Sequence, residues 1–381
     1  MDIHSKLPHV GTTIFTVMSA LAQQHNAINL SQGFPNFPTS EELHRLVYEY
    51  MQKGYNQYAP MAGAPLLRQR IAEKIAGMYG AAVDPESEIT ITAGGTQALF
   101  SAITAFIRPH DEVILFEPAY DSYAPSVEVN GGKVIPYTLQ APGYQVDWEK
   151  VTQLITPCTR MIIINTPHNP TGTAMKAADL EALERLTAGT NMLVLSDEVY
   201  EHLIFDGLSH QSVLRYPGLR ARSLAVYSFG KTFHHTGWKI GYCVAPPELT
   251  AEFRKVHQFN VFAVNTPIQY ALADYMANPS TYLSLPGFYQ QKRDFFLQAM
   301  QGSRLRPLPC EGTYFQLVDY SAVSDEADVQ FVRSLITDVG VAAIPVSVFY
   351  SGQAPGDRVI RLCFAKTEET LKQAGELLKK I

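Results

Sequence analysis

Lys231 is the residue of this 381-residue chain whose surroundings best suit covalent chemistry. It follows Ser223–Tyr227, a short run of β-branched and aromatic residues that is typical of a buried strand. Lys231 is therefore predicted just beyond the carboxyl end of a strand, where open α/β sheets bind ligands. A lysine amine in such a crevice can lose its proton and form a Schiff base with an aldehyde. Most lysines are instead exposed surface residues, so the neighbouring groups must decide between the two interpretations.

A phosphate-binding turn is predicted after a second strand. Ala93–Gln97 follows the strand predicted at Ile89–Thr92 and opens a helix. Glycines ahead of a helix leave backbone N–H groups free to bind a phosphate, and Thr96 adds a hydroxyl. After the next strand, Tyr120 could stack on an aromatic ligand.

Two more segments place polar side chains beyond predicted strands. Asn165–Gly172 is a rigid turn that presents two amides, including that of Asn169. Ser196–Tyr200 places Asp197 and Tyr200 at the rim of the sheet. Taken singly, such residues more often cap a helix, form a turn or fill the core.

Together these groups meet the requirements of pyridoxal phosphate. They supply a phosphate cradle, a ring platform, a carboxylate for the pyridine nitrogen, donors for the ring hydroxyl and a lysine. Competing motifs fail, because Ala225 replaces the first glycine of a Walker A loop and Val226–Gly230 lacks one glycine of a nucleophile elbow. His234 and His235 lack a second set of ligands, so no metal site is predicted.

The composition is that of a globular protein acting on small molecules. The net charge of -6 gives no basic footprint for nucleic acid or an anionic membrane. The four cysteines are far apart and are expected to be reduced thiols: Cys158, Cys243, Cys310 and Cys363. Met1–Pro8 lacks the apolar core of a signal peptide. We therefore expect a cytoplasmic protein without nucleic-acid or membrane partners.

Strands alternating with helices must position these groups. The strands are predicted at Ile89–Thr92, Val113–Phe116, Lys133–Thr138, Met161–Ile164, Met192–Leu195, Leu224–Tyr227 and Gly241–Val244. Helices are predicted at Glu41–Lys53, Pro65–Tyr79, Thr96–Arg108, Ala177–Thr187, Pro247–Gln258 and Pro267–Asn278. This order predicts an α/β fold with a mainly parallel seven-stranded sheet covered by helices on both faces. Val10–Asn26 is predicted as an amphipathic helix or an irregular arm, and mixed signals after Pro286 predict a smaller α+β layer.

Six motifs carry a resemblance to a known family: Asn29–Pro35, Asn56–Tyr58, Asn165–Pro170, Ser196–Tyr200, Ser228–Lys239 and Ile360–Phe364. From about Gly11 to its C-terminus the chain resembles class I pyridoxal-phosphate aminotransferases of fold type I. Within that family it is similar to bacterial methionine aminotransferases and kynurenine/glutamine transaminases. The resemblance implies a large cofactor-binding domain at 46–285 and a small domain at 286–381, to which an N-terminal arm at 1–45 contributes.

The resemblance also implies the catalytic and cofactor-binding roles. Lys231 would hold the cofactor as a Schiff base and move the proton from the substrate Cα, while Asp197 would pair with the pyridinium nitrogen. Asn169 and Tyr200 would bond the ring hydroxyl, and Tyr120 would stack on the ring. The implied phosphate ligands are Gly95, Thr96, Gln97, Ser228 and Lys239, with Tyr58 reaching in from the second subunit of a homodimer.

Arg361 would bind the substrate α-carboxylate as a bidentate guanidinium fork, with Gly33 and Asn169 completing that end of the site. The resemblance places Phe15 and the partner's Phe262 around the substrate side chain. Because this lining offers no second cation, an acidic side chain would be buried without a partner. We expect methionine first, then aromatic amino acids, kynurenine and glutamine, with a 2-oxo acid as the second substrate of a ping-pong reaction.

Two alternatives remain open at this point. A pyridoxal-phosphate β-lyase would have the same set of site residues. The second interpretation is therefore a kynurenine–oxoglutarate or glutamine transaminase with cysteine-conjugate β-lyase activity. A non-enzymatic regulator would need an added basic DNA-binding segment, which the sequence does not show.

Overall fold

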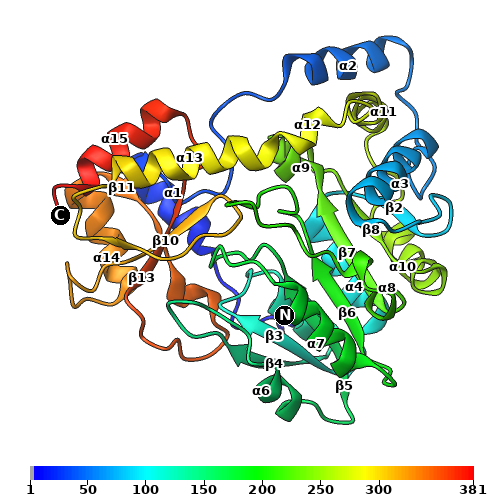
Figure 1. The fold of residues 1–381 in the computed structure, drawn as a ribbon, viewed down its shortest axis with the longest axis horizontal. Helices are drawn as coiled ribbons and strands as arrows, with labels where there is room; N and C mark the ends of the chain where they lie inside the picture. The colour runs from blue at the N-terminus through cyan, green and yellow to red at the C-terminus, as the bar shows by residue number, and fades with distance from the viewer. Residues whose placement is uncertain (1–3) are drawn as a thin grey trace.

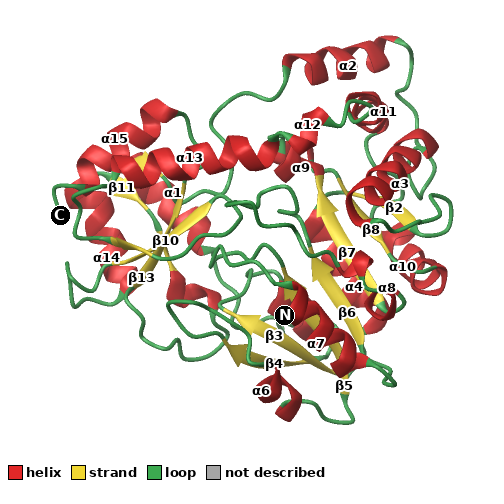
Figure 2. Ribbon diagram, in the orientation of Figure 1, coloured by secondary structure: helices red, strands yellow, loops and turns green. Residues whose placement is uncertain are grey.

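The computed structural model describes residues 4–381, and its largest element is a β-sheet. The strands of this sheet are β2 (Ile89–Thr92), β3 (Glu112–Glu117), β4 (Lys133–Thr138), β5 (Thr159–Asn165), β6 (Leu193–Asp197), β7 (Ser223–Ser228) and β8 (Gly241–Val244). In the described residues it has seven strands, in the order β2-β8-β7-β6-β5-β3-β4 (Figure 2). Within this described sheet β8 is antiparallel to both of its neighbours, β2 and β7, and the other strand pairs are parallel. The predicted mainly parallel seven-stranded sheet is confirmed.

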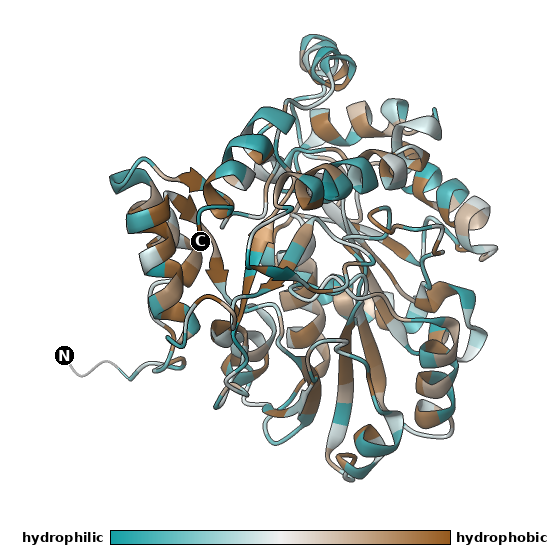
Figure 3. Ribbon diagram, turned by 60° about the vertical axis from the view of Figure 1, so that its left-hand side comes forward, coloured by the Kyte–Doolittle hydropathy of each residue, from teal (hydrophilic) through white to brown (hydrophobic). Residues whose placement is uncertain are grey.

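Helices cover both faces of the sheet because its strands are apolar on both sides. In β3, Val113 and Leu115 belong to a core cluster that also includes residues of α4 (Gly95–Phe106), α5 (Tyr123–Val129) and α10 (Pro247–Asn260). The alternate residues Ile114 and Phe116 belong to the core on the other face, which includes α3 (Pro65–Tyr79) and α7 (Ala177–Thr187). Figure 3 shows the apolar strands in brown between helices whose colours are mixed.

A smaller α+β layer joins the two ends of the chain. β1 (Ile28–Asn29) pairs in parallel with β11 (Val341–Ala342), and a second sheet has the order β12-β13-β10-β9. These strands are β9 (Arg306–Pro307), β10 (Phe315–Asp319), β12 (Ile344–Pro345) and β13 (Val359–Cys363). Figure 1 shows α1 (Ile14–Gln24, blue) among the orange and red C-terminal elements, which include α14 (Asp328–Ser334) and α15 (Glu368–Leu378). The predicted second layer is therefore present, and the divisions at residues 45 and 285 stay a prediction.

Some predicted elements have different bounds. α2 (Glu41–Gln52) and α11 (Thr266–Tyr275) lie close to the predicted ranges, but α13 (Leu285–Ala299) was not predicted. This long helix, yellow in Figure 1, connects the two layers and begins with a proline in its first turn. The strand predicted to end at Leu195 continues to Asp197, which is the last residue of β6. Within residues 4–381, no helix has both the length and the hydropathy needed to cross a bilayer.

Candidate active site

A cavity of about 230 Å³ lies where β5, β6 and β7 end. Asn165, Asp197 and Ser228 are the last residues of these three strands, and all three line the cavity. The cavity also brings together most of the predicted site residues: Phe15, Gly33, Gly95, Thr96, Tyr120, Asn169, Tyr200, Lys231, Lys239 and Arg361. Residues from both layers of the fold therefore meet at one place.

Lys231 lies on the short helix α9 (Phe229–Thr232), directly after β7. Its Nζ donates hydrogen bonds to the Tyr314 hydroxyl at 2.8 Å and to the Gly33 carbonyl at 3.3 Å. Burial lowers the pKa of this amine to about 8. A fraction of Lys231 is therefore neutral near neutral pH, as Schiff-base formation requires.

Asp197 is buried beside Lys231 and accepts two hydrogen bonds. The Tyr123 hydroxyl donates to Oδ2 at 2.6 Å, and the Val199 N–H donates to Oδ1 at 3.2 Å. Burial raises the pKa of Asp197 to about 6. A cationic pyridinium beside this carboxylate would favour its charged form.

Arg361 closes the opposite end of the cavity. Its side chain is 1% exposed, and its guanidinium carbon lies 3.9 Å from the centre of the Phe315 ring. Nη1 donates to Asn169 Oδ1 at 2.8 Å and Nη2 donates to the Ser31 carbonyl at 3.2 Å. Within residues 4–381 the buried Nε has no hydrogen-bond partner. A buried donor of this kind suits an anionic ligand such as a carboxylate.

The groups near α4 suit a phosphate. Gly94 precedes the helix with a φ of +83°, a conformation that favours glycine, and α4 directs its N-terminal N–H groups to this end of the cavity. The hydroxyls of Thr96 and Ser228 and the amine of Lys239 line the same cavity. The N-terminus of α4, the two hydroxyls and the lysine amine together form a site suited to an anion. The donor set from Arg361 to α4 therefore fits pyridoxal phosphate with an amino acid.

Comparisons with known proteins agree with this geometry. The family model for aminotransferase class I and II matches residues 25–378. The chain belongs to this aminotransferase family. The predicted family, the predicted aminotransferase activity and the predicted pyridoxal 5′-phosphate cofactor are confirmed. Its substrates are an amino acid and a 2-oxo acid.

Individual relatives match over nearly the whole chain. The aminotransferase is 55% identical to methionine aminotransferase from Escherichia coli, over 99% of this chain and 98% of that protein. It is 34% identical to human kynurenine–oxoglutarate transaminase 1, over 94% of this chain and 93% of that protein. A crystal structure of an Escherichia coli protein with a methionine aminotransferase function matches with a TM-score of 0.98 and 54% identity, over 100% of both chains.

Three predicted site residues lie apart from the cavity of their own chain. The Gln97 side chain contacts Ser101 of its own helix α4 at 2.7 Å and His257 of α10 at 3.2 Å. Tyr58 and Phe262 are 79% and 55% exposed, and their ring centres are 5.0 Å apart. The roles of Tyr58 and Phe262 require a second subunit, and that of Gln97 requires its backbone N–H, so all three roles stay predictions.

Tyr123, Tyr314 and Phe315 belong to the aminotransferase site but were not predicted from the sequence. Tyr123 lies three residues after Tyr120, in a segment where only the stacking of Tyr120 on an aromatic ligand was predicted. Tyr314 and Phe315 fall among the mixed signals after Pro286, where no site residue was predicted before Arg361. No local sequence pattern marks any of these three residues, because each acquires its role by contact with a segment that is distant in the sequence.

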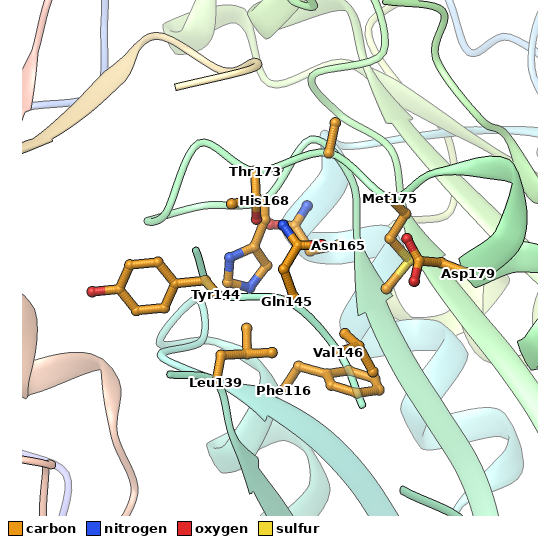
Figure 4. A pocket seen from close by; sticks show the side chains of 11 residues that line it. Phe116, Leu139, Tyr144, Gln145, Val146, Asn165, His168, Thr173, Met175 and Asp179 are labelled. Atoms are coloured by element: carbon orange, nitrogen blue, oxygen red, sulfur yellow. The ribbon is translucent and has the colours of Figure 1, made fainter. Parts of the chain in front are cut away.

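A second cavity of about 30 Å³ lies behind the Asn165–Asn169 turn (Figure 4). It is lined by Phe116, His168 and Met175 among others, and it shares Asn165 with the main cavity. Burial lowers the pKa of His168 to about 4, so this imidazole is neutral. The volume suits about one water molecule rather than a substrate.

Proposed function

We propose that this aminotransferase prefers methionine as its amino-group donor and works by a ping-pong reaction with a 2-oxo acid. The observation that carries the proposal is the composition of the substrate end of the cavity. In the described residues, the cations lining the cavity are Lys231, Lys239 and Arg361. The first two lie at the cofactor end, so Arg361 serves the α-carboxylate and an acidic side chain has no cation of its own.

The walls around Arg361 are aromatic. The ring centres of Phe15 and Phe315, which both line the cavity, lie 5.3 Å and 3.9 Å from the guanidinium carbon, and that of the buried Phe349 lies 5.2 Å away. Aromatic walls suit a long neutral side chain, and a thioether gains about 1 kcal/mol from contact with a ring. The identity of 55% to methionine aminotransferase from Escherichia coli supports the same substrate.

The chain's own residues supply binding and proton transfer. When bound, the cofactor supplies an electron sink for the negative charge that develops at the substrate Cα. Arg361 holds the α-carboxylate, and Lys231 Nζ removes the Cα proton as a general base. Asp197 keeps the ring nitrogen protonated, while Asn169 and Tyr200 donate or accept hydrogen bonds at the ring hydroxyl. Tyr120 would stack on the ring, and the N-terminus of α4 with Ser228 and Lys239 would hold the phosphate.

The test is a panel of amino acids with one fixed 2-oxo acid acceptor. We expect kcat/KM for methionine to exceed that for aspartate by at least roughly 100-fold, because aspartate would bury an unpaired charge. A preference for aspartate would overturn the substrate assignment and leave the cofactor chemistry intact.

A kynurenine or glutamine transaminase with cysteine-conjugate β-lyase activity is the second candidate. The aromatic walls favour it as well, since a kynurenine ring can pack against Phe15, which lines the cavity. Incubation with a cysteine conjugate in the absence of an acceptor separates the two: release of pyruvate and ammonia at a rate above methionine turnover would favour the lyase.

The same proposal includes a homodimer with shared active sites. Tyr58 and Phe262 lie together on the surface, and Phe259 on α10 is 88% exposed. Large aromatic residues gathered at an exposed face are typical of a subunit interface. A monomeric mass in dilute solution with full activity would contradict this part of the proposal.

A cytoplasmic location completes the proposal. The four cysteines are free, which is typical of a reducing compartment. Recovery of the native protein in the cytosolic fraction of its source cells would support this location, and recovery in a secreted fraction would exclude it.

A further inference from the structure

The amine of Lys231 contacts Tyr314, which has no assigned role, and the backbone carbonyl of Gly33. Tyr314 precedes β10, and Gly33 follows β1 in the N-terminal segment. Lys231 Nζ lies 2.8 Å from the Tyr314 hydroxyl and 3.3 Å from the Gly33 carbonyl oxygen. The Tyr314 hydroxyl also bonds to the Gly33 carbonyl. Three segments far apart in the sequence therefore form a closed triangle of polar contacts.

The direction of these hydrogen bonds follows from their chemistry. A carbonyl oxygen only accepts, so the Tyr314 O–H donates its one proton to Gly33. The Tyr314 oxygen then presents its lone pairs to Lys231, and the lysine donates to both partners. A neutral amine has two N–H groups and one lone pair. With both N–H groups engaged, the lone pair is left for the cavity that Lys231 lines.

Both acceptors are held firmly. Tyr314 is fully buried, and its ring packs edge-on against Tyr200 with centres 5.2 Å apart. A Cβ on Gly33 would lie 2.7 Å from the Phe315 ring, so the Gly33 backbone sits tightly on β10. Lys366 donates to the next carbonyl, that of Phe34, at 2.8 Å. Burial also raises the pKa of Tyr314 well above its usual range, so the group stays a neutral phenol.

We propose that Tyr314, together with the Gly33 carbonyl, is a positioning residue that holds the free Lys231 amine with its lone pair directed at the substrate. This inference rests on the proposed role of Lys231. It assigns to Tyr314 the orientation of the base between proton transfers, when Lys231 is not bonded to the cofactor. No proton passes to or from Tyr314.

Two consequences distinguish this role from simple packing. Acceptors favour the ammonium form of lysine, so loss of the Tyr314 oxygen lowers the pKa of the free amine. Loss of orientation also slows proton transfer at the substrate Cα and leaves carboxylate binding by Arg361 unchanged.

The test uses Tyr314→Phe, which removes one oxygen and keeps the ring packed on Tyr200. Tyr289→Phe is the matched control, because this buried phenol bonds to His234 at 2.9 Å and its ring centre lies 6.0 Å from that of Tyr314. With methionine, we expect kcat of Tyr314→Phe to fall roughly tenfold with little change in KM. The kinetic isotope effect with α-deuterated methionine should rise, since proton transfer becomes slower.

A second readout uses the cofactor-free protein and needs no turnover. Pyridoxal, which lacks the phosphate, is trapped on lysine with borohydride across a range of pH, and the modified peptide is mapped. We expect trapping at Lys231, with a pH midpoint that moves down by roughly one unit in Tyr314→Phe and stays in place in Tyr289→Phe.

The outcomes separate this inference from the proposed function. Trapping of the wild type at another lysine would overturn the role of Lys231 itself. Trapping at Lys231 with an unchanged midpoint and unchanged kcat in Tyr314→Phe would overturn only the positioning role. An equal loss in both variants would mean that Tyr314 acts through general packing, and it would also overturn the inference.

Discussion

The side-chain amines of Lys74 and Lys231 both lie inside the protein, but Lys74 is bonded to a carboxylate and Lys231 only to neutral groups. Lys74, on α3, forms a salt bridge with Glu201 and donates to the Tyr242 hydroxyl at 2.9 Å. Lys231 donates to a carbonyl and a neutral phenol. Burial lowers the pKa of both amines, but in Lys74 the adjacent Glu201 carboxylate opposes the shift. Burial therefore favours a neutral, reactive lysine amine where no carboxylate is bonded to it, as at Lys231.

The segment after β6 contributes to both surroundings. Asp197 and Tyr200 line the active-site cavity. Glu198 and Glu201 point into the core, where Glu198 accepts from His210 at 2.9 Å and from Tyr227 at 3.0 Å. The buried contacts of Glu198 and Glu201 fix the segment. The segment in turn holds the Asp197 carboxylate, which has no salt-bridge partner in the described residues, beside Lys231. Catalytic and structural charges are thus neighbours in sequence and are separated by the direction of their side chains.

The largest effect should come from Lys231→Ala. We expect kcat to fall by more than roughly 10⁴-fold, and the visible absorption of the lysine-bound cofactor to disappear, because both the general base and the attachment point are lost. Absorption spectra and a transamination assay measure this. Lys74→Met is the control and should keep both properties in the folded fraction; a reducible cofactor adduct with near-normal turnover in Lys231→Ala would remove Lys231 from the mechanism.

Lys74→Met should instead lower stability. It leaves the Glu201 carboxylate, which is 3% exposed, with only hydroxyl donors. We expect the free energy of unfolding to fall by about 3 to 5 kcal/mol in chemical denaturation of the cofactor-free protein. The double variant Lys74→Met, Glu201→Gln should recover part of this loss. A change below about 1 kcal/mol would show that the pair is not important for stability.

Asp197→Asn extends the comparison to carboxylates. The Asp197 pKa is raised from 3.8 to about 6, so the folded protein resists its ionisation. Below pH 4 both folded and unfolded forms are protonated, and the wild type has no penalty. As the pH rises from about 4 to about 6, only the unfolded form ionises, so the folded wild type loses up to about 3 kcal/mol relative to Asp197→Asn, and the difference is constant above that range. Unfolding of the cofactor-free proteins between pH 4 and 7.5 measures this difference; a constant difference across that range would mean that Asp197 is not strained by burial.

The smallest effect should be a gain in stability from Lys231→Met. The Lys231 pKa is lowered from 10.5 to about 8, so the folded protein disfavours its charged form. At pH 7 the cofactor-free variant should be more stable than the wild type by about 1 to 2 kcal/mol, less than the shift implies because the side chain is partly exposed to the cavity. The advantage should fade as the pH rises from 8 to 10.5, where the unfolded lysine also becomes neutral. A loss like that of Lys74→Met would show that Lys231 is paired after all.

The sequence by itself determined the fold class, the cofactor chemistry and most of the cavity. These features are encoded locally, since each strand is a short apolar run, and Lys231, Asp197 and Asn169 lie at or just beyond strand ends that parallel pairing brings to one edge. Glycines ahead of α4 indicate the phosphate end in the same local way.

Only the tertiary structure decided which side chains touch. Tyr314 and Gly33 both contact Lys231, from which they are 83 and 198 positions away in the sequence. Lys74 and Glu201 are separated by 127 positions. No sequence spacing records such contacts, because they arise where loops from two layers pack together. The same packing leaves Lys74 paired and Lys231 bonded only to neutral groups, and this difference in partners makes one buried lysine structural and the other a base.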